Sequence, residues 1–136
     1  MILVDTGPLV ALFDPADRDH KRCTERLRAL REPLTTTVPV LTEAFHLLEP
    51  ASQGARGLMS FVADSGLDLW HFDDRTLTRA FELMQQYSDQ PMDLADASLV
   101  SAAEALGLRK VFTLDRQDFT TYRVRRGHRY LTFEMI

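Results

Sequence analysis

Four acidic residues have types and positions that could do chemistry together. Asp5 directly follows the apolar run at the start of the chain, and Asp115 directly follows a second apolar run. Asp96 lies near the start of a predicted helix, and Glu43 lies within a mostly apolar helical segment. Carboxylates gathered on one spot repel each other unless a cation neutralises them. The set therefore predicts a site for a hard divalent ion, Mg²⁺ or Mn²⁺.

Ions of this kind keep several waters and contact the phosphate groups of a substrate. They can turn water into a nucleophile and stabilise the leaving oxygen of an in-line displacement. We therefore interpret Asp5, Glu43, Asp96 and Asp115 as the catalytic and metal-binding residues of a metal-dependent nuclease. The sequence leaves open whether one ion or two would be used.

Three further residues are possible supporting members of this site. Thr6 and Thr113 each lie within two residues of a site acid, where a hydroxyl could donate a hydrogen bond to a carboxylate. Ordinary strand-end threonines remain the alternative. Asp93 lies three residues before Asp96 and is either a fifth acid or only a helix cap.

Each site acid also has a plain structural explanation. Asp96 could serve the start of its helix, where acids are favoured by the unpaired N–H groups. Asp115 could begin a turn, and Glu43 could face solvent. The functional interpretation depends on all of them converging at the ends of strands, which is where open parallel sheets bind ligands.

Length and composition set the frame for this site. The chain has 136 residues, of which 45% are hydrophobic and 26% charged, which indicates a single globular domain over residues 1–136. No apolar stretch approaches the roughly 20 residues that cross a bilayer, and the first residues do not resemble a signal peptide. Cys23 is the only cysteine, which excludes an internal disulfide and a multi-cysteine zinc site. We expect a cytoplasmic protein without membrane contact.

The net charge and the type of basic residue bear on whether the partner is a nucleic acid. A formal net charge of -4 is unusual for a protein that binds nucleic acid. The positive charge is nearly all arginine, whose planar fork suits phosphate, although solvated surfaces are an equal alternative. It concentrates in two groups: Arg18, Arg22, Arg26, Arg28 and Arg31, and then Arg123, Arg125, Arg126 and Arg129.

Strand-like and helix-like segments alternate along the chain, which predicts an α/β fold with a mainly parallel central sheet. The expected strands are residues 2–4, 34–37, 67–70, 110–114 and 130–133. The expected helices are residues 9–13, a second one from Asp14-Pro15 to about residue 30, 39–48, 58–63, 74–84 and 93–106. Residues 115–119 are interpreted as a turn and a loop anchored by Phe119.

Several of these segments together resemble PIN domains. The resemblance runs through residues 2–12, 41–43, 94–100 and 112–119, and thus covers nearly the whole chain in order and spacing. It implies a three-layer α/β/α sandwich and a Mg²⁺- or Mn²⁺-dependent endoribonuclease. The four acids and Thr113 would be the family's site residues. The short chain is similar to VapC-like toxins of bacterial toxin–antitoxin pairs, which implies a homodimer, an RNA substrate and a small antitoxin partner.

One hypothesis from a different class stays open. The net acidity also suits a non-catalytic regulatory module that acts by forming a complex with an antitoxin and operator DNA. The acidic residues would then be a docking surface for arginine. Other phosphate-handling α/β enzymes fit poorly, since a haloacid-dehalogenase-type phosphatase needs an acid where Gly7 stands.

Overall fold

The computed structural model describes all 136 residues, and one or two helices follow each of the first four strands along the chain. The strands are β1 (Ile2–Val4), β2 (Leu34–Thr37), β3 (Asp68–Trp70), β4 (Lys110–Phe112), β5 (Arg123–Arg126), β6 (Arg129–Thr132) and β7 (Glu134–Met135). The helices are α1 (Thr6–Phe13), α2 (His20–Ala29), α3 (Val38–Leu47), α4 (Gln53–Ala63), α5 (Asp74–Gln86), α6 (Leu94–Leu106) and α7 (Arg116–Thr121).

A five-stranded sheet in the order β3-β2-β1-β4-β7 forms the centre of the molecule, and every pair of neighbours in it is parallel. β1 occupies the middle, with Leu3 in register with Thr35 on one side and Val111 on the other. All three residues of β1 are buried, as expected for a parallel strand covered on both faces. The predicted parallel sheet is confirmed.

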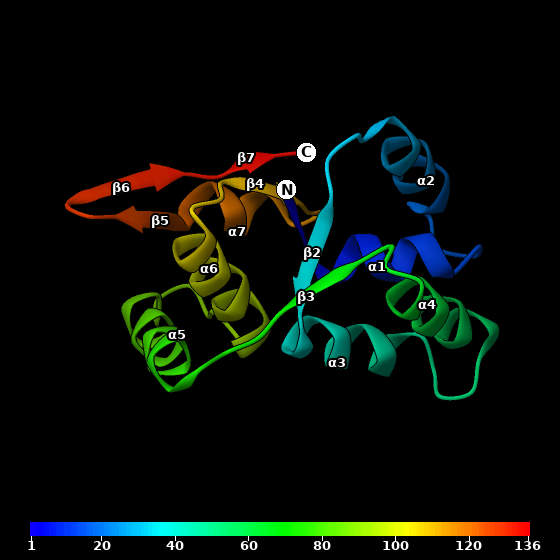
Figure 1. Cartoon of the computed structure of the whole chain (residues 1–136), viewed down its shortest axis with the longest axis horizontal. Helices are drawn as coiled ribbons and strands as arrows, with labels where there is room; N and C mark the ends of the chain where they lie inside the picture. The colour runs from blue at the N-terminus through cyan, green and yellow to red at the C-terminus, as the bar shows by residue number, and fades with distance from the viewer.

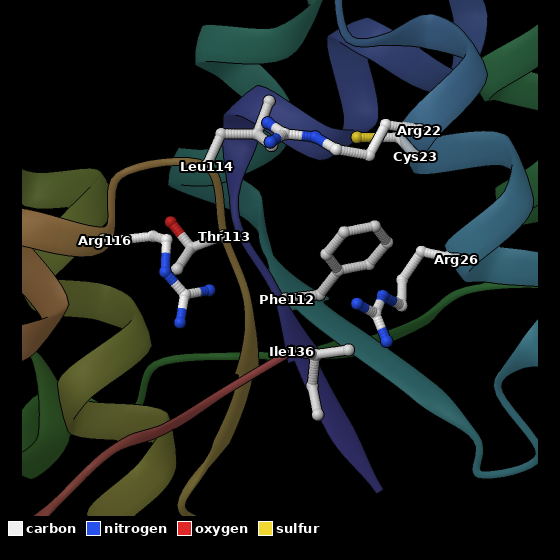
Figure 2. A pocket seen from close by; sticks show the side chains of 8 residues that line it. All are labelled: Arg22, Cys23, Arg26, Phe112, Thr113, Leu114, Arg116 and Ile136. Carbon is white, nitrogen blue, oxygen red and sulfur yellow. The ribbon is translucent and has the colours of Figure 1, made fainter.

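Helices cover both faces of this sheet, which confirms the α/β/α sandwich. Figure 1 shows α5, α6 and α7 on one side and α1, α2 and α4 on the other. On the second side, α2 reaches the sheet through its buried Cys23, and Figure 2 shows Cys23 and Phe112 on the facing elements α2 and β4. None of the helices is both long and apolar enough to cross a lipid bilayer.

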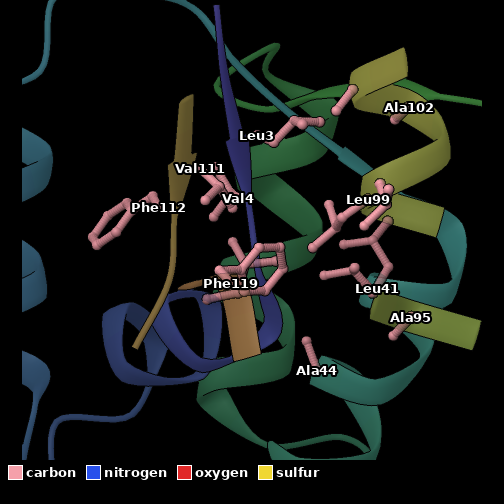
Figure 3. Packing of buried hydrophobic residues seen from close by; sticks show 14 of the residues in the cluster. Leu3, Val4, Leu41, Ala44, Ala95, Leu99, Ala102, Val111, Phe112 and Phe119 are labelled. Atoms are coloured by element: carbon pink, nitrogen blue, oxygen red, sulfur yellow. The ribbon is translucent and has the colours of Figure 1, made fainter. Parts of the chain in front are cut away.

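One continuous apolar core holds the layers together. α6 contributes most to it, because eight of its residues are buried. Leu99 of α6 and Phe119 of α7 lie with Val4 of β1 in the packing that Figure 3 shows. The alternation of small and large side chains lets α6 lie close to the sheet, and this fixes the position of the helix start that carries Asp96.

Several helices begin at other residues than the sequence indicates. α1 begins at Thr6, because Asp5 accepts a hydrogen bond from the Thr6 backbone N–H and caps the helix. α2 begins at His20 rather than directly after Pro15. α4 begins at Gln53, capped by Ser52, which is five residues before the expected start at residue 58.

The C-terminal region corrects two predictions. The expected fifth strand at residues 130–133 forms as β6, but it pairs antiparallel with β5 in a hairpin outside the central sheet. Gly127 allows this hairpin turn with a φ of 61°. The fifth strand of the sheet is instead β7, which pairs with β4. The segment expected as a turn and loop forms the helix α7, so that prediction is wrong. The burial predicted for Phe119 is confirmed.

Candidate active site

The four predicted site acids line one open depression at the carboxyl edge of the sheet. They come from four separate places in the fold: the end of β1, the middle of α3, the first turn of α6 and the start of α7. The structure thus brings together Asp5, Glu43, Asp96 and Asp115, which are far apart in sequence. Asp93, Thr6 and two other acidic residues join them, and no lysine or arginine lines the depression.

Asp5 is the most buried of the acids, with 7% of its surface exposed. Both of its oxygens are held: Oδ1 accepts from the Thr6 backbone N–H at 2.8 Å and Oδ2 from Thr113 Oγ1 at 2.8 Å. Burial raises the pKa of Asp5 from 3.8 to about 6, against these two hydrogen bonds and with added repulsion from Glu43 and Asp115. A carboxylate this rigid and this poorly solvated is prepared for a cation rather than for water.

Asp96 lies in the first turn of α6, three residues after the capping residue Asp93. Asp93 Oδ1 accepts from the Asp96 backbone N–H at 2.8 Å, so the cap predicted for Asp93 is present, and Asp93 also lines the depression. The Tyr122 hydroxyl donates to Asp96 Oδ2 at 3.2 Å. Burial raises the pKa of Asp96 to about 8, with further repulsion from Asp93 and Asp5.

Glu43 is half-buried and lines the depression, so it does not lie on a solvent face of α3. Burial raises its pKa, and the negative charge of Asp93 adds to this shift. The Thr6 hydroxyl is near enough to lower the Glu43 pKa, yet Thr6 Oγ1 is buried with no hydrogen-bond partner within bonding geometry. An unpaired buried hydroxyl beside carboxylates is a site where an ion's water could be held.

Asp115 caps α7, and its Oδ1 accepts from the Asp118 backbone N–H at 3.3 Å. Burial raises the pKa of Asp115, and its contact with Asp118 contributes to the same shift. The Thr113 hydroxyl accepts from the Asp115 backbone N–H at 2.9 Å, so Thr113 connects Asp115 with Asp5. Both supporting threonines predicted from the sequence therefore lie at the acids.

Sequence reasoning missed other residues of this site. Asp118 lines the depression and accepts a hydrogen bond from Gln90 Nε2 at 2.7 Å, and Asp17 lines it from the α1–α2 connection. Asp118 lies three residues after Asp115, and residues three apart lie on the same side of a helix. A helix prediction for this segment would therefore have placed Asp118 beside Asp115. Nothing in the sequence marks Tyr122, which ends α7 and whose hydroxyl reaches Asp96 at the start of α6.

The donor set fits a hard divalent cation. Every candidate ligand is an oxygen, and the raised pKa values of Asp5 and Asp96 show that negative charge there lacks compensation. No three His, Cys, Asp or Glu side chains meet at one point as a complete ligand cage. Mg²⁺ does not need such a cage, because it usually keeps several waters and takes one or two carboxylates.

The predicted arginine groups lie outside the depression. The first lies on α2 and its flanks, and the second lies on the β5–β6 hairpin. Arg123 and Arg126 donate hydrogen bonds to backbone carbonyls, whereas Arg22 pairs with Asp19 at 2.8 Å. None of the arginines in these two groups therefore lines the acidic depression.

Comparisons with known proteins show which sequences and folds this chain is similar to. The PIN domain family matches residues 2–124. Ribonuclease VapC26 of Mycobacterium tuberculosis is 26% identical over 131 residues, which cover 95% of this chain and 97% of that protein. The crystal structure of Mycobacterium tuberculosis VapC20, described as a sarcin-ricin loop cleaving toxin, superposes with a TM-score of 0.78 at 19% identity, over 87% of this chain and 94% of that one. A toxin–antitoxin complex from Klebsiella pneumoniae has a chain that superposes with a TM-score of 0.68 at 21% identity, over 89% and 92% of the two chains.

Proposed function

Because the chain belongs to the PIN domain family, we propose that it is a metal-dependent endoribonuclease that hydrolyses RNA phosphodiester bonds. The observation that carries the proposal is the gathering of Asp5, Glu43, Asp96 and Asp115 from four elements around one depression. Ribonuclease VapC26, similar over nearly the full length of both chains, supports RNA as the substrate.

The four acids differ in how deeply they are buried, and this suggests different roles for them. Asp5 and Asp96 would hold the cation, since they are the acids whose pKa values are raised most. Glu43 and Asp115 complete the set from the more open side of the depression. When bound, Mg²⁺ or Mn²⁺ would supply an activated water and charge neutralisation at the phosphate. Thr113 fixes the orientation of the Asp5 carboxylate, and Tyr122 does the same for Asp96.

The biological setting we propose is that of the toxin of a type II toxin–antitoxin pair in the cytoplasm. The structural likeness to a chain of the toxin–antitoxin complex from Klebsiella pneumoniae supports a small antitoxin as partner. A homodimer is part of the same proposal. Size-exclusion chromatography with light scattering, on the chain alone and with the product of an adjacent open reading frame, tests both partners.

Metal-dependent cleavage is the first expected result. The purified chain should cleave total cellular RNA with Mg²⁺ or Mn²⁺ and should stop when EDTA is added, because the acids repel phosphate without a cation. Gel electrophoresis of the RNA gives the readout. Cleavage that is equal in EDTA, and that Asp96→Asn loses, would contradict metal dependence, because the activity would then belong to this chain.

A second candidate function is a regulatory module that acts only by complex formation with an antitoxin and operator DNA. The net charge of -4 and the absence of lysine and arginine from the depression favour it. An arginine side chain of a partner would neutralise these acids as a cation does. This function gains if the chain, freed of partner and loaded with metal, leaves a panel of RNAs uncut and still binds the antitoxin.

Changing Thr113 to valine should lower kcat/KM for RNA cleavage by about 10- to 100-fold, the range for residues that orient metal ligands. Valine keeps the shape but removes the hydroxyl that donates to Asp5 and accepts from the Asp115 N–H. Because the lost hydrogen bond lowers the Asp5 pKa, the rising limb of the pH–rate profile should move to higher pH.

Serine at position 113 is the matched control, because it restores the hydroxyl without the methyl group. Thr113→Ser should keep most of the activity and the original pH profile. If the valine and serine variants behave alike, Thr113 acts through packing and does not position Asp5.

A further inference from the structure

A second hollow lies beside the acidic depression, and its lining has the opposite charge. It encloses about 170 Å³ between α2, the end of β4 and the start of α7. Figure 2 shows Arg22 and Arg26 reaching over it from α2 and Arg116 from the opposite side, with Thr113 and Phe112 between them. No acidic side chain lines this arginine hollow.

Two of these three guanidinium groups are free to bind a ligand. Arg22 pairs with Asp19 at 2.8 Å, but Arg26 and Arg116 form no ion pair with any acid of the chain. Neither of their side chains donates a hydrogen bond within the protein either, in contrast to Arg123 or Arg126. Unpaired guanidinium groups facing one concave surface attract an anion, and the concave shape concentrates their field.

The arginine hollow and the acidic depression share a wall. Thr113 lines the hollow, and its hydroxyl donates to Asp5 in the depression. Leu114 lines both, and Arg116 directly follows Asp115. An anion held by Arg26 and Arg116 would therefore lie on the other side of one connection, residues 113–116, from the site acids.

We infer that the arginine hollow binds a backbone phosphate of the RNA strand, next to the phosphate that enters the acidic depression. The inference rests on the proposed nuclease function. A ligand that occupies both places must present one phosphate to a cation in the acidic depression and a second anionic group to the arginines of the hollow. A single RNA strand does so because its phosphates repeat along the backbone, and guanidinium forks match phosphate oxygens. An acidic peptide could occupy the hollow alone, but it has no reason to continue into a row of carboxylates.

Direct binding of a fluorescein-labelled single-stranded oligoribonucleotide tests the inference. Fluorescence anisotropy at low salt is measured with Ca²⁺ in place of Mg²⁺, so that a divalent cation neutralises the acids, and gel electrophoresis of the same samples checks that the RNA stays intact. Arg26→Ala and Arg116→Ala should each raise Kd by about tenfold, as expected for a lost charge-assisted hydrogen bond. Each should also reduce the slope of log K against log salt by about 0.7, the value for one phosphate contact on a single strand. Both arginines are exposed, so the melting temperature should stay unchanged.

Arg28→Ala is the matched control, because Arg28 is an exposed arginine of α2 that lies outside the hollow. It should change Kd by less than about twofold. Equal losses in Arg28→Ala and the hollow variants would overturn the inference in favour of a diffuse charge effect, as would unchanged affinity or absence of RNA binding by the wild type. Binding of a glutamate-rich peptide that depends on Arg26 and Arg116, with RNA binding unaffected, would overturn it in favour of an acidic protein partner.

This outcome is separable from the outcome for the proposed function. If the wild type cleaves RNA but its hollow variants bind like Arg28→Ala, the nuclease stands and the phosphate site fails. If RNA binding depends on the two arginines but no metal yields cleavage, the nuclease function fails and the hollow remains a phosphate-binding site.

Discussion

Replacing Asp96 with asparagine is expected to lower kcat/KM for RNA cleavage by about 10²- to 10³-fold, the range for removing one group that acts on developing charge. The same change should raise the melting temperature of the metal-free chain. Asp96 is surrounded by Asp93 and Asp5, whose charges add to the burial that raises its pKa to about 8. Asparagine has nearly the same shape, still accepts from the Tyr122 hydroxyl and removes the repulsion.

The prediction is specific because activity should fall while the melting temperature rises. Asp89→Asn removes one negative charge at an exposed position outside the depression, and it should leave both activity and melting temperature unchanged. Steady-state cleavage of a labelled oligoribonucleotide and thermal denaturation in EDTA provide the two measurements. A variant that loses activity and stability together would indicate that Asp96 is a structural residue of α6.

Metal should stabilise the chain most strongly at alkaline pH. The folded pKa values of Asp5 and Asp96, about 6 and about 8, lie above the ordinary value of 3.8, so the folded chain binds more protons than the unfolded chain between these values. The stability of the metal-free protein therefore falls as pH rises from about 4 to about 8. A cation replaces the protons, and at 100 times its Kd it adds about 2.7 kcal/mol.

Thermal denaturation at pH 5 and pH 8, with EDTA or with Mg²⁺, measures this effect. The gain in melting temperature on adding Mg²⁺ should be larger at pH 8 and should shrink in Asp96→Asn. Calorimetry should register protons released as the ion binds. A gain that is equal at both pH values, or equal in the variant, would show that the ion binds elsewhere.

Much of the site could be predicted because parallel strands end at the same edge of a sheet. Short apolar runs identify β1 and β4, and an acid at the end of each then has a definite place. Asp96 follows from the helix start that Asp93 caps. These inferences need only local patterns and one rule of topology, and they hold in the structure.

Other parts depend on packing that a sequence does not show. Glu43 faces the depression because α3 packs against α1 and α6. The apolar residues around Glu43 in the sequence do not determine which side of α3 faces these helices. Tyr122 and Asp118 reach the site only because residues 116–121 form a helix instead of a loop. The β5–β6 hairpin carries strand-forming residues, but their pairing partner is decided by the turn at Gly127. Arg116 belongs to neither group of arginines in the sequence, so the sequence does not predict its place in the arginine hollow.

The central position of β1 has a consequence for the time at which the protein becomes functional during its synthesis. Its three residues are made long before Val111, the partner of Leu3 in β4, and 108 residues separate Asp5 from the Thr113 hydroxyl that donates to it. Such distant pairing makes folding slow, because the intervening chain must be ordered first. A ribosome that stalls before residue 110 would therefore hold a nascent chain whose central strand has a neighbour, β2, on one side only and whose set of acids lacks Asp115. Under the proposed function, the site acids can therefore assemble only after residues 110–115 have been made.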